Sequence, residues 1–198
     1  MTMDEKMEKG LLWTDTGDYL EEQSRAKSLM YEFNLLHPSK KAERIKMLPE
    51  IFASVGEDVW IEPPIALARG KTVTIGEATY INSNLTLVDD YKISIGSHCL
   101  IAPNVTIATT GHPVHAALRP KGEMYSFPVT IGNNVWIGCT VVILPGVTIG
   151  DNTVIGAGSV VTKSIPANVI AFGNPCRVIR KITDRDREYY YHDLKVKP

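Results

Sequence analysis

The sequence predicts a mainly β fold, a parallel β-solenoid with a helical segment before it and a cap after it. The first observation is a six-residue repeat of β-branched aliphatic residues, namely Ile131, Ile137, Ile143, Ile149, Ile155 and Val161. The second is that glycine follows four of these six residues. The third is that the same spacing occurs earlier, at Ile75, Ile81 and Leu87 and at Ile95, Ile101 and Ile107. Such a repeat indicates stacked units that bury one continuous core.

The length of the repeat indicates what each unit is. An amphipathic helix repeats its apolar residues every 3.6 positions, so a period of six excludes a helix. Apolar positions in each unit alternate with corners rich in Gly, Asn and Asp, which tolerate the positive φ of a turn. Six residues therefore form a short strand and a corner, and three units close one triangular coil with its aliphatic residues inside.

The first part of the chain, residues 1–57, is predicted to be a helical segment that packs on the solenoid. Residues 21–36 and 39–55 carry apolar side chains at helical spacing. Ala42, Ile45 and Phe52 are expected along one apolar face of the second helix. Pro49 is expected to kink or end that helix, because proline lacks the N–H that a helix interior needs.

The solenoid is predicted to span residues 58–170, with one extruded loop at about 109–128. Within the loop the six-residue positions hold Pro113, Arg119 and Tyr125, which do not suit an aliphatic core. Long loops in compact proteins are usually functional or disordered. The loop is therefore the first place to look for a functional site.

A smaller irregularity lies at Asp89–Asp90, where the repeat slips by two positions between Leu87 and Ile95. A functional site and a simple bulge explain this slip equally well. Residues 171–198 leave the repeat and are predicted to cap the open end of the solenoid, as the ends of repeat proteins require.

Composition and charge exclude several classes of function. The net charge of the 198 residues is −1, which gives no bulk attraction to nucleic acid or to an anionic membrane. The three cysteines are widely separated and form no CxxC motif, as is typical of reduced thiols in a cytosolic protein. The charged N-terminus is no signal peptide, and no apolar run approaches the roughly 18 residues that span a bilayer. We therefore expect a cytoplasmic protein.

Longer motifs point to a family. The stretches TGHPVH, VTIGNNVWIG, VIGAGSVVTKSIP and GNPCRVIRKI resemble those of hexapeptide-repeat acyltransferases. Nearly the whole chain is similar to the sugar O-acetyltransferases that act on galactosides or maltose. YEFN, EMYSFPVTIGNNVWIG and PCRVIR favour the galactoside branch, whereas GNP and AER also suit the maltose branch.

The resemblance implies a left-handed β-helix, an exception to the usual right-handed crossover. It also implies a homotrimer with active sites between neighbouring subunits, and acetyl-coenzyme A (acetyl-CoA) as the donor. The reaction implied is transfer of acetyl to a hydroxyl, expected to be the 6-hydroxyl of a galactoside or related sugar.

The catalytic position of the family falls on His112. A sugar hydroxyl is a weak nucleophile near neutral pH, so it needs a general base, and imidazole suits this pH range. Pro113 favours an extended conformation at His112. Direct attack on the thioester in a ternary complex then needs no covalent enzyme intermediate. His115 is expected to be an ordinary loop residue.

A metal site is the competing interpretation of the two histidines. Residues three apart in an extended segment point to opposite faces, and zinc needs at least three protein ligands. The histidine set of the zinc lyases that resemble γ-class carbonic anhydrases, which use the same solenoid, is not evident. We therefore expect no metal requirement.

The resemblance assigns acceptor binding to six residues: Asp15, Tyr80, Asn82, Asp90, Glu123 and Met124. Carboxylates and amides suit sugar hydroxyls because they hold hydrogen bonds in a fixed geometry. The chain departs from the family at Ala68–Arg69, where galactoside enzymes have a small hydroxyl residue and maltose enzymes an acid. One acceptor hydrogen bond is therefore expected to be missing, and the identity of the acceptor stays open.

The resemblance assigns donor binding to seven residues: Trp136, Cys139, Ala157, Thr162, Lys163, Arg177 and Arg180. Backbone groups at stacked corners suit the pantetheine arm, and the Lys and Arg side chains suit the nucleotide phosphates. Cys139 raises the alternative of a covalent acetyl-cysteine. The group that stabilises the oxyanion stays open.

Other functions remain open at this point. The acceptor could be maltose, glucose or a xenobiotic alcohol. A different class is a non-catalytic solenoid that serves as a binding module. A module that had lost its activity would typically lose the loop histidine, whereas His112 is present with its flanking residues.

Overall fold

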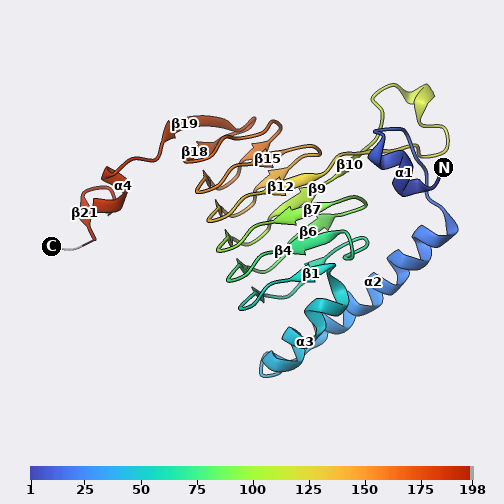
Figure 1. Ribbon diagram of the computed structural model, residues 1–198, viewed down its shortest axis with the longest axis horizontal. Helices are drawn as coiled ribbons and strands as arrows, with labels where there is room; N and C mark the ends of the chain where they lie inside the picture. The colour runs from blue at the N-terminus through green and yellow to red at the C-terminus, as the bar shows by residue number, and fades with distance from the viewer. Residues whose placement is uncertain (197–198) are drawn as a thin grey trace.

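The computed structural model describes residues 1–196 and confirms the predicted parallel β-helix (Figure 1). The first sheet contains β1 (Ser54–Val55), β4 (Val73–Ile75), β7 (Ile93–Ile95), β12 (Val129–Ile131) and β15 (Thr148–Ile149). The second contains β2 (Trp60–Ile61), β5 (Tyr80–Ile81), β8 (Leu100–Ile101), β13 (Trp136–Ile137), β16 (Val154–Ile155), β18 (Val169–Phe172) and β19 (Arg177–Lys181). The third contains β3 (Ile65–Ala66), β6 (Leu85–Val88), β9 (Thr106–Ala108), β14 (Val142–Ile143) and β17 (Val160–Val161).

The aliphatic residues of the repeat line the interior of the coils. Ile137 pairs with Ile101 on one side and with Ile155 on the other, so equivalent residues stack directly. All three are buried. At the corners, Asn104 and Asn152 adopt the positive φ expected of turn residues. The core and the corners are therefore those that the six-residue period predicts.

The coils before the extruded loop are two residues longer than those after it. Thr130 pairs with Thr148, eighteen positions on, whereas the coils before the loop repeat every twenty positions. The extra residues lie after β6, at Asp89–Asp90 as the sequence predicts, and after β3, within residues 68–71, where the sequence analysis missed them. The loop itself follows β9, the next strand of the same sheet. All three departures therefore stack along one edge, between the third and first sheets, which we call the expanded edge.

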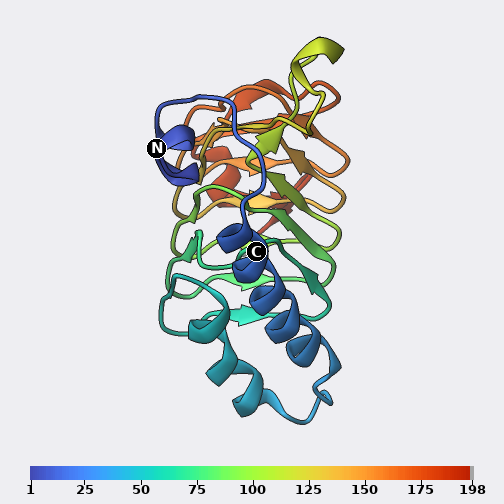
Figure 2. The ribbon, with the colours of Figure 1, turned by 90° about the vertical axis from the view of Figure 1, so that its right-hand side faces the viewer.

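Three helices precede the coils, α1 (Met3–Glu8), α2 (Gly17–Leu35) and α3 (Lys41–Ile51). Figure 2 shows α2 alongside the coils, where it contacts β3, and α3 beside the first coil, where it contacts β1. In residues 1–196 no helix combines the length and the apolar character that crossing a membrane requires.

The predicted apolar face of α3 was wrong in part. Phe52, just after the helix, is buried, but Ala42 is exposed and Ile45 is 48% exposed. The buried positions within the helix are instead Arg44, Leu48 and Ile51. Arg44 lies on this face because its guanidinium stacks on the Phe33 ring and donates to a main-chain oxygen of α2's C-terminal turn. Such a long side chain can bury its stem while its charged head keeps polar partners.

The proline in α3 lies inside the helix, two residues before its last residue, Ile51. The expectation that Pro49 ends the helix therefore holds only approximately, since one further half-turn follows it. This half-turn matters for the fold because Ile51 packs against the first coil, close to Gly70. A Cβ at Gly70 would lie 2.4 Å from the main-chain oxygen of Ile51, and its φ of +69° also favours glycine.

The last part of the chain continues the second sheet and then leaves it. Strand β19 pairs antiparallel with β18 at the final coil. Beyond it, α4 (Arg185–Glu188), β20 (Tyr189–Tyr191) and β21 (Leu194–Lys195) project away from the coils (Figure 1). We call residues 182–196 the C-terminal arm. The final two residues of the predicted 171–198 cap lie outside the described part of the chain.

Candidate active site

The extruded loop begins and ends as a short antiparallel ladder. Strand β10 (Thr110–Gly111) pairs with β11 (Tyr125–Ser126), and the 3₁₀ helix η1 (Ala116–Leu118) lies between them. The hydroxyls of Thr110 and Ser126 lie 2.7 Å apart and add a side-chain bond to this ladder. A Cβ at Gly111 would lie 2.6 Å from the hydroxyl of Tyr125, so a larger residue there would displace the Tyr125 side chain. The residue after Gly111 is therefore held by a well-defined base.

That residue is His112, and one of its ring nitrogens has a fixed partner. Its Nδ1 lies 2.9 Å from the main-chain oxygen of Glu123, across the loop. A carbonyl oxygen can only accept, so Nδ1 carries the proton in the neutral ring. Nε2 is then the nitrogen with the free lone pair. The side chain is exposed, and its geometry suits a general base.

His115 has a different environment. It is the N-cap of η1, where its Nδ1 accepts a hydrogen bond of 3.2 Å from the N–H of Ala117. Capping a short helical turn is a structural role. Within residues 1–196, no three or more His, Cys, Asp or Glu side chains lie together in an arrangement that could hold a metal ion.

The segment before α2 is hydrogen-bonded to the far side of the loop. Trp13 and Met124 exchange two main-chain hydrogen bonds of 2.9 and 2.8 Å. The indole N–H of Trp13 also donates to the hydroxyl of Ser126, at 3.0 Å. Trp13 belongs to a small apolar cluster with Met7, Tyr19 and Tyr91, against which Met124 packs. We call residues 1–16 the N-terminal strap, because they tie the loop to α2.

Asp89 has a structural role at the expanded edge. Its carboxylate accepts hydrogen bonds from the N–H groups of Ala68, Arg69 and Gly70 and from the hydroxyl of Thr72. Burial raises the pKa of Asp89, while these donors act in the opposite direction. Asp89 therefore fixes the corner that the sequence analysis missed.

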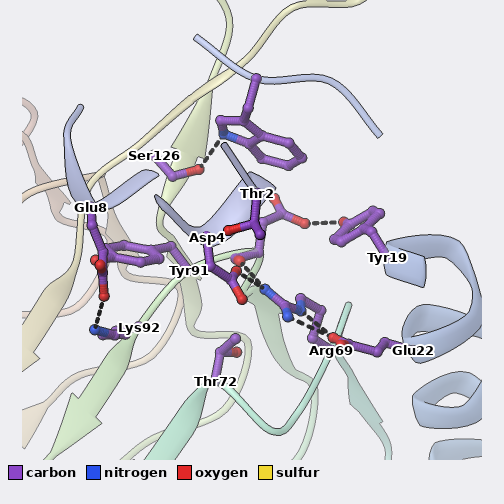
Figure 3. A network of polar contacts seen from close by, with 12 residues as sticks. Thr2, Asp4, Glu8, Tyr19, Glu22, Arg69, Thr72, Tyr91, Lys92 and Ser126 are labelled. Carbon is purple, nitrogen blue, oxygen red and sulfur yellow. Dashed lines mark hydrogen bonds and ion pairs between the residues drawn. The ribbon is translucent and has the colours of Figure 1, made fainter. Parts of the chain in front are cut away.

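Asp90 is the acceptor-binding candidate of the pair, and it too is buried. Tyr19, on the first turn of α2, donates its hydroxyl hydrogen bond to Oδ1 of Asp90 (Figure 3). The main-chain oxygen of Asp90 accepts from the guanidinium of Arg69, at 3.1 Å. Burial and the hydrogen bond to Asp90 raise the pKa of Tyr19 well above its ordinary range. Asp15, in the strap, adds a further negative charge near the same hydroxyl.

Arg69, the departure from the family pattern, is paired within the chain. Its guanidinium is 2.6 Å from a carboxylate oxygen of Glu22 and 3.1 Å from one of Asp4 (Figure 3). Only 9% of its side chain is exposed, whereas both carboxylates are largely exposed. Arg69 therefore holds α1 and α2 against the expanded edge. Sequence analysis missed this network, although the unusual Arg69 was the signal that could have pointed to it.

The acceptor candidates fall into two groups in one chain. Asp15, Asp90, His112, Glu123 and Met124 belong to the expanded edge, the loop and the strap. Tyr80 and Asn82 instead lie at the end of β5 in the second sheet, at the edge between the second and third sheets. One chain therefore does not bring Tyr80 and Asn82 to His112.

Three of the seven donor candidates, Trp136, Cys139 and Ala157, lie with this second group. Trp136 is on β13, two coils beyond Tyr80 in the same sheet, and Cys139 and Ala157 occupy successive corners at its edge. The stacking of these corners is direct, because Gly158 N–H donates to the oxygen of Cys139 at 2.9 Å. Cys139 is exposed, and its corner follows a strand of the second sheet, on a different edge from the expanded edge.

The remaining donor candidates lie near the last coil. They differ in whether their side chains already have an ion-pair partner within the chain. Thr162 and Lys163 follow β17, and both are exposed. Arg177 is also exposed, at the start of β19. Arg180 makes a bidentate pair with Asp186, with distances of 2.7 and 2.8 Å, and this pair lowers the pKa of Asp186. Arg180 is therefore engaged within the chain.

Comparisons with known proteins show the family to which the chain is similar. The family model for the bacterial transferase hexapeptide (six repeats) matches residues 128–163, and that for the maltose acetyltransferase hexapeptide capping motif matches residues 6–56. Over 197 residues the chain is 59% identical to the galactoside O-acetyltransferase of Escherichia coli K12, covering 99% of this chain and 97% of that protein.

Two solved structures extend the comparison. A galactoside acetyltransferase in complex with coenzyme A matches with a TM-score of 0.98 and 58% identity, covering 100% of both chains. A maltose O-acetyltransferase from Clostridium difficile matches with a TM-score of 0.90 and 44% identity, covering 92% of this chain and 98% of the other.

Proposed function

The chain belongs to the hexapeptide-repeat sugar O-acetyltransferases, the galactoside and maltose acetyltransferase family, and we propose that it transfers acetyl from acetyl-CoA to the 6-hydroxyl of a galactoside or related sugar. The enzyme class, an acetyl-CoA-dependent O-acyltransferase, follows from the family. The observation that carries the mechanism is the hydrogen bond from His112 Nδ1 to the main-chain oxygen of Glu123.

His112 is the general base of the proposed reaction. Nε2 accepts the proton of the sugar hydroxyl as its oxygen attacks the thioester carbonyl, and the Nδ1 hydrogen bond stabilises the imidazolium that forms. The tetrahedral intermediate collapses with loss of the coenzyme A thiolate, which takes the proton from Nε2. Acetyl passes directly to the acceptor in a ternary complex. Direct transfer needs no acetyl-cysteine intermediate at Cys139.

The donor binds along the edge between the second and third sheets. The stacked corners at Cys139 and Ala157 offer main-chain groups to the pantetheine arm. Arg177, an exposed cation that pairs with Phe172 at the end of β18, suits the nucleotide phosphates at this edge. Lys163 is also exposed but follows β17, at the edge between the third and first sheets, and Arg180 would first have to leave Asp186. No step in this mechanism needs a metal ion.

The working enzyme is a homotrimer with each active site shared between neighbouring subunits. Support comes from the separation of the two candidate groups, since Tyr80 and Asn82 can meet His112 only if they come from another copy. Further support comes from exposed apolar side chains on the second sheet, Leu100 and Trp136, each 54% exposed. The projecting C-terminal arm is also more readily explained if it packs on a neighbour (Figure 1).

The acceptor is tested with a panel of sugars at saturating acetyl-CoA, with release of free thiol as the rate and NMR of the product as the position of the acetyl group. The panel contains a β-galactoside, the matching β-glucoside, maltose and a non-sugar alcohol. The proposal expects fastest transfer to the galactoside and acetyl at its 6-hydroxyl. Faster transfer to maltose would place the chain in the maltose branch, and transfer only to the non-sugar alcohol would contradict a sugar acceptor.

A further inference from the structure

Tyr19 is hydrogen-bonded to one carboxylate oxygen of Asp90, a residue that the proposed function assigns to acceptor binding. Its hydroxyl donates to Asp90 Oδ1 and accepts from the side-chain amide of Gln23, at 3.1 Å. A phenol has a single proton to donate. The Tyr19 hydroxyl therefore has no donor left for a ligand, and Oδ1 of Asp90 already has a partner.

The other oxygen of Asp90 has no such partner. Among residues 1–196, no protein hydrogen bond reaches Asp90 Oδ2. Within the same range, the one fully buried side-chain polar atom that lacks a partner is Nε of Arg44. Oδ2 therefore keeps contact with solvent although 95% of the residue's surface is covered, Asp90 being 5% exposed. It is the oxygen from which an acceptor hydroxyl can be bound.

The ring of Tyr19 is in contact with two other side chains, Trp13 and Arg69. Trp13 packs edge to face against it, with ring centroids 5.7 Å apart. The guanidinium of Arg69 lies 5.8 Å from the ring centroid. Arg69 also pairs with Glu22, one turn further along α2. The residue that departs from the family pattern thus fixes the helix turn that carries Tyr19.

We propose that Tyr19 is a positioning residue for acceptor specificity, which limits Asp90 to one acceptor hydroxyl, bound through Oδ2. The inference rests on the proposed function, in which Asp90 binds the sugar. A carboxylate with two free oxygens can accept hydrogen bonds from two neighbouring hydroxyls of a sugar ring. With Tyr19 bound on Oδ1, two neighbouring hydroxyls cannot bind one to each oxygen, so Asp90 recognises the hydroxyl that reaches Oδ2.

The test compares wild type with Tyr19→Phe on a β-galactoside and its 2-, 3- and 4-deoxy analogues. Loss of a hydroxyl that a buried polar group requires lowers kcat/KM, because that group is left unpaired. In wild type we expect one deoxy analogue to have a lowered kcat/KM, because it lacks the hydroxyl that binds Asp90. In Tyr19→Phe we expect the neighbouring deoxy analogue to become penalised as well, by about tenfold, mainly through KM.

Two further variants separate this effect from general damage. Tyr91→Phe removes a phenol hydroxyl from the same apolar cluster without touching Asp90, so its profile across the analogues should match wild type. In an Asp90→Asn background, adding Tyr19→Phe should change nothing further, because the proposed effect acts through the carboxylate. Thermal unfolding of each variant checks that the fold is kept.

The possible outcomes are distinct. Equal profiles for wild type and Tyr19→Phe, within about twofold for every analogue, would overturn the inference while leaving the acetyltransferase function intact. A similar change in Tyr91→Phe would also overturn it. Failure of wild type to acetylate any sugar would overturn the proposed function, and this inference with it.

Discussion

The Nδ1 atom of His112 lies 2.9 Å from the main-chain oxygen of Glu123, which joins the two ends of the extruded loop. This bond sets the tautomer of the ring and leaves Nε2 to act as the base. Because the partner is a main-chain atom, the tautomer does not depend on the identity of the side chain at position 123. The loop's path, fixed by its base and by the N-terminal strap, is what positions the catalytic group.

Glu123→Ala separates the two roles that Glu123 has in this account. The variant keeps the main-chain oxygen that orients His112, so kcat should stay within about twofold of wild type. The carboxylate is a proposed acceptor ligand, and its loss should raise KM for the sugar by about tenfold, the size of one hydrogen bond to a charged group. In the structure the carboxylate accepts a hydrogen bond from the N–H of Lys121, and this bond lowers the pKa of Glu123.

Steady-state kinetics with varied sugar and saturating acetyl-CoA measures both quantities. A large fall in kcat with unchanged KM would show that the carboxylate, and not the main-chain oxygen, supports His112.

Tyr19 should make the stability of the protein fall in alkaline solution. Its raised pKa means that, above about pH 10, the unfolded chain loses the phenol proton while the folded chain keeps it. The stabilisation is therefore complete below pH 10 and is lost as the pH rises above it, by at most about 1.4 kcal/mol per pH unit. Urea unfolding between pH 8 and 11 should show a steeper decline for wild type than for Tyr19→Phe. Parallel curves for the two proteins would mean that Tyr19 ionises as freely in the fold as in the unfolded chain.

Arg177→Ala should weaken the binding of acetyl-CoA, and only through the loss of a contact to the nucleotide phosphates. Removing one phosphate-binding cation should raise KM for acetyl-CoA by about tenfold and leave kcat nearly unchanged. Acetyl-pantetheine, which lacks the nucleotide, provides the control, because its KM should be the same for wild type and variant. Equal effects on both donors would show that Arg177 supports the shape of the last coil instead of binding phosphate.

Much of the fold could be predicted because the core residues themselves recur every six positions. Ile131 to Val161 keep this period without interruption, and the same residues are buried in the structure. The loop could be located because Pro113 and Arg119 stand where the period requires aliphatic residues. The handedness of the coil rests on the resemblance to the family, since periodicity does not specify it.

The second expanded corner could not be predicted in this way. The insertion at Asp89–Asp90 falls between two clear stretches of the repeat, so the slip is visible. The insertion at residues 68–71 follows only one short coil, so too few repeats precede it for a break in the six-residue spacing to be visible. Its function as a partner of Asp89 depends on contacts across the coil, which no local pattern encodes.

In the helical segment, apolar spacing located the helices but did not identify all of their buried residues. The spacing of apolar residues located α2 and α3, but it placed Ile45 on the buried face when Arg44 lies there instead. A cation with a neighbouring aromatic ring and a carbonyl partner can be buried as readily as an aliphatic residue, and hydrophobic periodicity does not register it. Tyr19 and Trp13 were missed at the candidate site for a related reason, because their roles arise from contacts with the loop and with Asp90.

The central claim is that His112 is the general base of acetyl transfer, and the most direct measurement is kcat for His112→Ala with saturating acetyl-CoA and β-galactoside. The account predicts a fall of at least about a hundredfold, as is typical of a lost general base. KM for acetyl-CoA and the thermal unfolding midpoint should change little, because the His112 side chain is exposed and bound to the fold by one hydrogen bond. A variant that folds and retains the kcat of wild type would contradict the account.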